Sequence, residues 1–139
     1  MKSKRLANLL VGSLLLAGSC ITTALLQAPQ AYAGSFNIIG EWTGSPDCQI
    51  NFLDDDGTTI EGNCDNGSFN HIIQGSYSTK DPNRINITVT RIDYSTGCKT
   101  SVRGYIRVID NDNVRFWQEG WHGCGVNTAP ATSTWTRLE

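Results

Sequence analysis

The cysteines after residue 33 are spaced symmetrically about short turn sequences, and this spacing restricts the fold more than any other feature. Cys48 and Cys64 lie equidistant from Asp56, at the centre of an acidic turn. The flanking segments Gln49–Leu53 and Thr59–Asn63 alternate apolar and polar residues, which is typical of paired strands. In a hairpin with this symmetric register, the two cysteines lie opposite each other within disulfide reach.

The second pair of cysteines follows the same rule. Cys98 and Cys124 lie equidistant from Asn111, and the segments Val102–Ile109 and Val114–Trp121 flank that turn. Of the three possible pairings of four cysteines, the spacing favours the one in which each hairpin has its own disulfide. The predicted bonds are Cys48–Cys64 and Cys98–Cys124. Metal sites made of four cysteines use short C-x-x-C spacing, which is absent, so no zinc site is expected.

The N-terminal segment has the three parts of an export signal. Three basic residues within the first five positions precede the apolar run Leu6–Leu26, and Ala31-Tyr32-Ala33 supplies the small residues of a cleavage site. The sequence therefore predicts a cleaved signal over 1–33 and a single domain over 34–139. Two alternatives are an uncleaved membrane anchor and a lipoprotein signal that is lipidated at Cys20.

Removal of the signal changes the charge and the cysteine count. The full chain carries 11 Lys+Arg and 13 Asp+Glu; without the three basic signal residues 8 and 13 remain, a net charge of −5. Such a chain is a poor candidate for binding nucleic acid or, after cleavage, an anionic membrane by charge alone. An even number of cysteines in a short exported domain indicates disulfides and a secreted or periplasmic location.

The pattern after residue 33 predicts an all-β domain, because no 11-residue stretch keeps helical periodicity. Short runs of alternating apolar and polar residues, separated by tight turns, favour an up-and-down antiparallel β-barrel of about eight strands, cross-linked by the disulfides. A two-sheet β-sandwich is the alternative. The expected strands are Ile38–Thr43, Cys48–Leu53, Thr58–Asn63, Asn70–Ser78, Arg84–Asp93, Lys99–Ile109, Val114–Trp121 and Thr132–Leu138.

The register of the second hairpin places three pairs opposite one another on one of its faces. The pairs are Arg103–Glu119, Tyr105–Trp117 and Arg107–Arg115. The first two are favourable cross-strand contacts. Two arginines opposite each other are unfavourable unless an anion or a carboxylate lies between them.

The order of short motifs resembles the calycins, the superfamily of lipocalins, fatty-acid-binding proteins and avidin-like barrels. Gly40-Glu41-Trp42 matches their G-x-W on the first strand, Gly75-Ser76-Tyr77 resembles the G-x-Y of an avidin-like strand, and Trp135-Thr136-Arg137 places a basic residue on the last strand. The resemblance implies an eight-stranded barrel with Trp42 at its closed end and Arg137 packed over that ring. It transfers no ligand, because the biotin-binding residues cannot be placed.

The candidate ligand-binding residues lie in the second hairpin. Trp117 and Trp121 are four residues apart, so on a strand they face the same side. Together with nearby side chains they could stack on a sugar or a flat ligand, or bind an anion. The alternative is aromatic packing with solvated charges on the barrel exterior. The complete candidate set is Arg103, Tyr105, Arg107, Arg115, Trp117 and Trp121.

Other chemistry has less support in the sequence. His71 and His122 lack partners with metal-ligand spacing, and the Asp-rich turns do not match an EF-hand. No nucleophile-elbow motif is present, and no catalytic residue or cofactor is predicted. We therefore expect an exported binding protein for a small molecule. The alternatives are a protein-directed module, such as an inhibitor of an exported hydrolase that uses the loop Gly123–Ala131, and a small secreted enzyme.

The interior of the barrel distinguishes these functions. If Trp42, Ile50, Phe52 and Phe116 fill it, no internal pocket remains, and a surface or partner site is favoured. A hollow interior favours an internal ligand.

Mass spectrometry of the exported protein tests the signal. We expect an N-terminus at Gly34, because small residues occupy the two positions that the signal peptidase reads. An N-terminus at Cys20 would show that the lipoprotein alternative is correct.

Overall fold

The computed structural model describes residues 36–45 and 48–139, and the predicted signal over 1–33 lies outside this part. The described residues form strands and turns without a helix, which confirms the predicted all-β class. No helix among them is long and apolar enough to cross a membrane. The strands are β1 (Gly40–Ser45), β2 (Cys48–Asp55), β3 (Thr59–Asp65), β4 (Phe69–Tyr77), β5 (Arg84–Asp93), β6 (Lys99–Val108), β7 (Asn113–Gln118), β8 (His122–Gly123), β9 (Val126–Asn127) and β10 (Ala131–Thr136).

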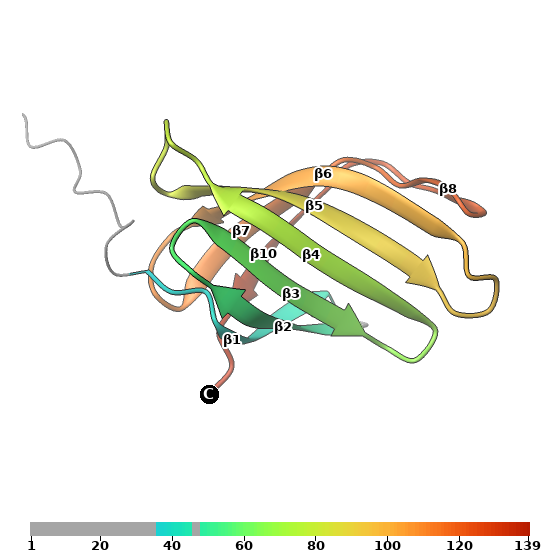
Figure 1. Ribbon diagram of the computed structural model, residues 1–139, viewed down its shortest axis with the longest axis horizontal. Helices are drawn as coiled ribbons and strands as arrows, with labels where there is room; N and C mark the ends of the chain where they lie inside the picture. Colours follow the sequence, from blue (N-terminus) through green and yellow to red (C-terminus); the bar gives the residue numbers. More distant parts are fainter. Residues whose placement is uncertain (1–35, 46–47) are drawn as a thin grey trace, which may run out of the picture.

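Eight of these strands form one antiparallel sheet in the order β1-β2-β3-β4-β5-β6-β7-β10, and β8 and β9 form a separate small hairpin. Figure 1 shows the sheet curving around its long axis, with the β8 hairpin extending at one end. The first and last strands meet through a bridge between Trp42 and Arg137. The result is a nearly closed barrel, as predicted, and it is compatible with a calycin-like architecture.

Closure between β1 and β10 is limited to a short stretch. The Leu138 N–H donates to the Glu41 carbonyl over 2.8 Å, and the Thr136 N–H donates to Thr43 Oγ1 over 3.0 Å. Within the described part of the chain, the only β-bridge between the two ends of the sheet joins Trp42 and Arg137. We call the line along which β1 and β10 run side by side the seam.

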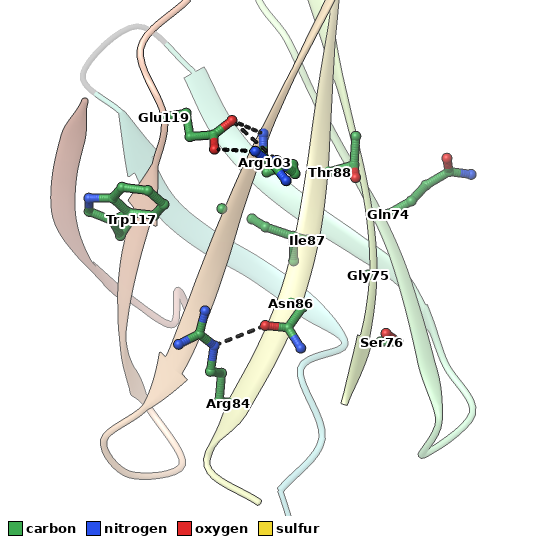
Figure 2. A pocket seen from close by; sticks show the side chains of 11 residues that line it. Gln74, Gly75, Ser76, Arg84, Asn86, Ile87, Thr88, Arg103, Trp117 and Glu119 are labelled. Atoms are coloured by element: carbon green, nitrogen blue, oxygen red, sulfur yellow. Dashed lines mark hydrogen bonds and ion pairs between the residues drawn. The ribbon is translucent and has the colours of Figure 1, made fainter. Parts of the chain in front are cut away.

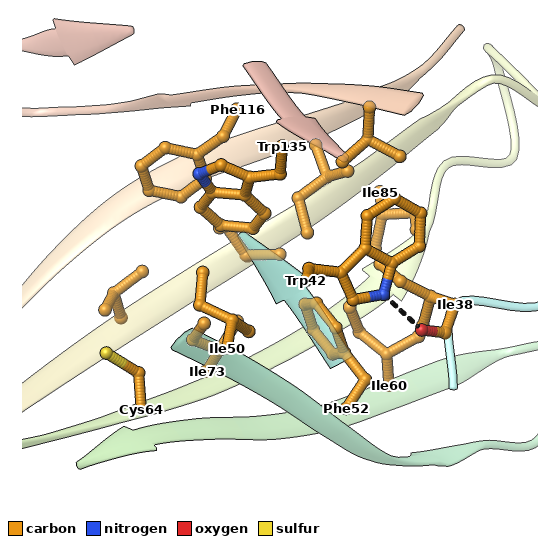
Figure 3. Close-up of a cluster of buried hydrophobic side chains, with 14 of the residues drawn as sticks. Ile38, Trp42, Ile50, Phe52, Ile60, Cys64, Ile73, Ile85, Phe116 and Trp135 are labelled. Atoms are coloured by element: carbon orange, nitrogen blue, oxygen red, sulfur yellow. Dashed lines mark hydrogen bonds between the residues drawn. The ribbon is translucent and has the colours of Figure 1, made fainter. Parts of the chain in front are cut away.

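Alternate side chains of the strands point into the barrel and form its core (Figure 3). Trp42 is completely buried, and its indole N–H donates to the Ile38 carbonyl over 2.8 Å. The rings of Phe116 and Trp135 stack with their centroids 4.2 Å apart. The side chains expected to fill the barrel, Trp42, Ile50, Phe52 and Phe116, all belong to this core.

Arg137 connects three parts of the chain where the two ends of the sheet meet. Its guanidinium lies 4.5 Å from the centroid of the Trp42 ring. It also donates to the carbonyls of Asn37, Ile39 and Asn111, which lie before β1 and in the turn before β7. A guanidinium can serve three acceptors and an aromatic face at once, because its donors form a planar fork.

Both predicted disulfides are present, with Cα atoms 5.7 Å apart in each. The symmetric register expected for the first hairpin is wrong, since Asn51 lies opposite Asn63 and Phe52 opposite Gly62. The pairing is centred between Gly57 and Thr58 rather than at Asp56, since Asp55 lies opposite Ile60. A bulge between Phe52 and Asp54 moves the register back by one residue, which is not enough to place the cysteines directly opposite, so the disulfide joins diagonal positions.

The predicted register of the second hairpin is correct. Tyr105 lies opposite Trp117, and Arg107 lies opposite Arg115. Two expectations at its far end are wrong: the strand expected to continue to Trp121 stops at Gln118, and the predicted loop Gly123–Ala131 contains β9.

Replacement of Arg137 tests the importance of its contacts for stability. We expect Arg137→Lys to lower the free energy of unfolding by about 2 kcal/mol, because an ammonium cannot serve the three carbonyls and the Trp42 face together. Thermal or urea unfolding would measure this change. Arg115→Lys is the matched control and should change stability by less than about 0.5 kcal/mol. Equal stability of wild type and Arg137→Lys would contradict this role.

Candidate functional site

Tyr105 and Trp117, which were predicted to lie opposite each other, are on the outer face of the barrel. The Tyr105 and Trp117 rings are stacked, with centroids 5.4 Å apart and planes inclined by 21°. The Arg84 guanidinium lies 4.2 Å from the centroid of the Tyr105 ring, and the Arg84 Nε–H donates to Asn86 Oδ1 over 2.9 Å. Arg84, Tyr105 and Trp117 therefore form one continuous stack across β5, β6 and β7.

The predicted arginines lie on the same face as this stack. Arg103 pairs with Glu119 at 3.0 Å, as the register predicted, although both side chains are largely exposed. The hydrogen bond from Arg103 lowers the pKa of the Glu119 carboxyl. The contribution of such an exposed pair to stability is small.

The unfavourable pair of arginines has a carboxylate beside it. Arg107 Nη2 donates to Asp81 Oδ2 over 2.8 Å, from the turn between β4 and β5. Asp81 therefore neutralises the charge of Arg107, and it is the kind of carboxylate that two opposed arginines were expected to need. Among the described residues, Arg115 takes part in no ion pair.

Trp121 does not share this face, so the expectation that Trp117 and Trp121 face the same side is wrong. Only 7% of Trp121 is exposed, and its ring stacks on the His71 ring at 5.3 Å. Strand alternation ends at Gln118, where β7 stops. The Trp121 N–H then donates to Thr128 Oγ1, and the Thr128 N–H donates to the Trp121 carbonyl, so this segment folds back on itself.

A groove of about 770 Å³ crosses the outer face of β4–β7 (Figure 2). At two of its positions only glycine fits: a Cβ on Gly104 would lie 2.3 Å from the Trp117 carbonyl oxygen, and one on Gly75 would lie 2.7 Å from the Asn86 carbonyl oxygen. The side chains that line the groove are mainly polar: Gln74, Ser76, Arg84, Asn86, Thr88, Arg103, Trp117 and Glu119. Of these, only Arg103 and Trp117 were candidates from sequence, although the outward alternation of β4 and β5 could have indicated the others.

A second, smaller cavity of about 240 Å³ lies in the barrel interior. Gly44 and Ile50 border it on one side of the seam, and the β10 residues Ala131, Thr132 and Ser133 border it on the other. The remaining lining is mostly apolar: Cys64, His71, Ile73, Val89, Phe116, Gln118 and Trp135. The core therefore fills most of the barrel but leaves room beside the seam.

His71 is the titratable group of this cavity. Its inward-facing ring is held between Phe69 and Trp121, with centroid distances of 4.7 and 5.3 Å. Burial lowers the pKa of the His71 imidazole to about 4, and the nearby charge of Arg91 adds to this effect. His71 is therefore neutral at pH 7, and its Nε2 is buried without a hydrogen-bond partner among the described residues.

The acidic turns have a structural role. Asp56 accepts hydrogen bonds from the Thr58 and Thr59 N–H groups, which lower the pKa of its carboxyl. Asp55 accepts from the Ile38 N–H and from the Tyr77 hydroxyl. Within residues 36–45 and 48–139, no group of three or more His, Cys, Asp or Glu could hold a metal ion.

No protein-family model, curated protein or solved structure matches the chain. A function must therefore be inferred from the chemistry of the cavity and of the outer face.

Acid titration tests the environment of His71. Between about pH 6.5 and 4, the unfolded chain binds a proton at His71 that the folded chain does not bind. The free energy of unfolding therefore falls as the pH falls through this range, by about 2 kcal/mol once solvent screening of the half-buried ring is allowed for. Urea unfolding between pH 7 and 4 would measure the change.

His71→Gln is the matched variant for this titration, because it keeps a polar side chain but removes the titrating group. The difference between wild type and His71→Gln isolates His71 from the carboxylates that titrate in the same range. A difference that does not vary with pH would contradict a lowered pKa at His71.

Proposed function

We propose that the protein is an exported, non-catalytic binding protein that holds one small, largely apolar molecule in the interior cavity. The main support for this proposal is that the cavity is partly enclosed and mostly apolar, with few polar groups, as small-molecule sites usually are. The two disulfides are consistent with a location outside the cytoplasm, where the predicted signal would direct the chain.

The cavity volume limits the size of the ligand. A dry apolar cavity of about 150 Å³ binds benzene, so about 240 Å³ suits a molecule with one or two fused rings. The polar groups of the lining limit its chemistry. His71 is neutral and cannot pair with a carboxylate as a cation, but its imidazole and the Gln118 amide can each share one hydrogen bond. The best ligand is therefore a small aromatic molecule with a single hydroxyl or N–H.

Indole and 2-naphthol are suitable probes of the cavity. We expect both to bind with micromolar to millimolar dissociation constants, measured by chemical-shift changes of the cavity-lining residues. Ser133→Phe places a ring at the cavity wall from a half-buried position of β10 and should weaken binding at least tenfold.

Thr134→Phe is the matched control. It adds the same ring to the next residue of β10, which points outward, and should leave binding unchanged. Failure of both probes to shift the cavity residues, or equal binding by wild type and Ser133→Phe, would overturn the proposed function.

A further inference from the structure

The groove on the outer face differs from the interior cavity in size, position and chemistry. It crosses β4–β7, whereas the cavity lies inside the barrel beside β1 and β10. Its side chains are charged or carry amides and hydroxyls, apart from Trp117 and Ile87 (Figure 2). The two sites can therefore be tested independently.

The outer face is cationic although the chain is acidic. Residues 36–79 contain no Lys or Arg, and the acidic residues in this part include Glu41 and Glu61. Four arginines, in contrast, project from β5–β7: Arg84, Arg103, Arg107 and Arg115. Glu119 and Asp81 neutralise two of them, and among the described residues neither Arg84 nor Arg115 forms an ion pair. A local excess of positive charge on an acidic protein favours an anionic ligand.

The polar lining fits a ligand that carries many hydroxyl groups. Gln74 lies on the outer face of β4, and Asn86 and Thr88 on that of β5, all within the groove. Each of these side chains can donate and accept, as the repeated hydroxyls of a saccharide require. Trp117 borders the groove from β7 and offers an apolar ring surface to the carbon-bound hydrogens of a sugar ring.

The same face lacks the apolar centre of a protein interface. Among the described residues, the exposed large hydrophobic side chains are Ile39, Leu53, Tyr94 and Ile109, and none of them lines the groove. The buried centre of a protein–protein interface is more apolar than the rest of the surface and depleted in charge. An acidic peptide would meet the arginines but would find few apolar groups to hold a side-chain anchor, since only Trp117 and Ile87 of the groove lining are large and apolar.

From these observations we infer that the groove over β4–β7 binds an acidic oligosaccharide. One sugar ring packs against Trp117, and the hydroxyls bond to the amide and hydroxyl side chains of β4 and β5. The carboxylates of the sugar acids pair with Arg84 in the groove and with Arg115, which lies outside the groove on the same face of β7, two residues before Trp117. The inference does not depend on the cavity ligand.

Uronic-acid tetrasaccharides and their neutral counterparts test this inference. The probes are tetramers of galacturonic, glucuronic and mannuronic acid, each compared by isothermal titration calorimetry with the neutral tetramer of the same linkage. We expect the mature protein to bind at least one acidic tetramer at least tenfold more tightly than its neutral counterpart. The affinity should fall as salt is raised, because exposed charges are screened.

Single substitutions locate the binding to the groove. Trp117→Ala should weaken binding about fivefold to tenfold, as expected for loss of one aromatic contact. Arg84→Gln and Arg115→Gln should each weaken it about tenfold. Lys99→Gln removes the same charge from the outer face of β6 away from the groove and should have no effect. Circular dichroism would confirm that each variant is folded.

Three results would overturn the inference: binding to none of the acidic tetramers, equal binding of acidic and neutral tetramers, or binding of polyglutamate in their place. Because indole and 2-naphthol report on the interior cavity, their binding to Trp117→Ala separates failure of this inference from failure of the proposed function.

Discussion

The contact between Trp42 and Arg137 is the interaction on which the rest of the structure depends. A sheet of eight consecutive antiparallel strands exposes two unpaired edges unless its first and last strands meet. Here they meet where the Arg137 guanidinium covers the buried Trp42 ring and bonds to carbonyls on both sides of the closure. The two disulfides act locally within β2–β3 and at the base of the β6–β7 hairpin, so they do not replace this contact.

Incomplete closure also accounts for the interior cavity. β1 and β10 are joined at Trp42 and Arg137, whereas the cavity is bordered by Gly44 on one strand and by Ala131–Ser133 on the other. The outer groove lies elsewhere, over β4–β7, where the ladders are continuous. One barrel therefore provides an apolar interior space and a polar, cationic exterior surface.

The sequence predicted most of the fold because alternation, turns and cysteine spacing are local signals. The β6–β7 register could be derived, because Tyr105 and Trp117 are equidistant from the turn centre at Asn111 and no bulge interrupts the pairing between them. The β2–β3 register could not, because the pairing is centred between Gly57 and Thr58 rather than at Asp56 and a bulge after Phe52 shifts it again. Asp55, at the end of β2, accepts from Ile38 and Tyr77, which are distant in sequence and give no local signal. Trp121 was misplaced because the end of β7 has no strong local signal. The importance of His71 was missed because its burial depends on Trp121 packing over it.

Amide hydrogen exchange along β10 tests the partly closed barrel most directly. The Arg137 N–H donates to the Asp112 carbonyl, toward β7. Because N–H groups alternate in direction along an antiparallel strand, those of Trp135 and Ser133 also face β7. The N–H groups of Thr134 and Thr132 face the seam instead. If the seam is open beside the cavity, the amides of Ser133 and Trp135 should exchange slowly and those of Thr132 and Thr134 rapidly. The amides of Thr136 and Leu138 should stay protected, because they donate to β1. Slow exchange at Thr132 and Thr134 would mean that β10 is paired on both sides and that the barrel is closed along its whole length.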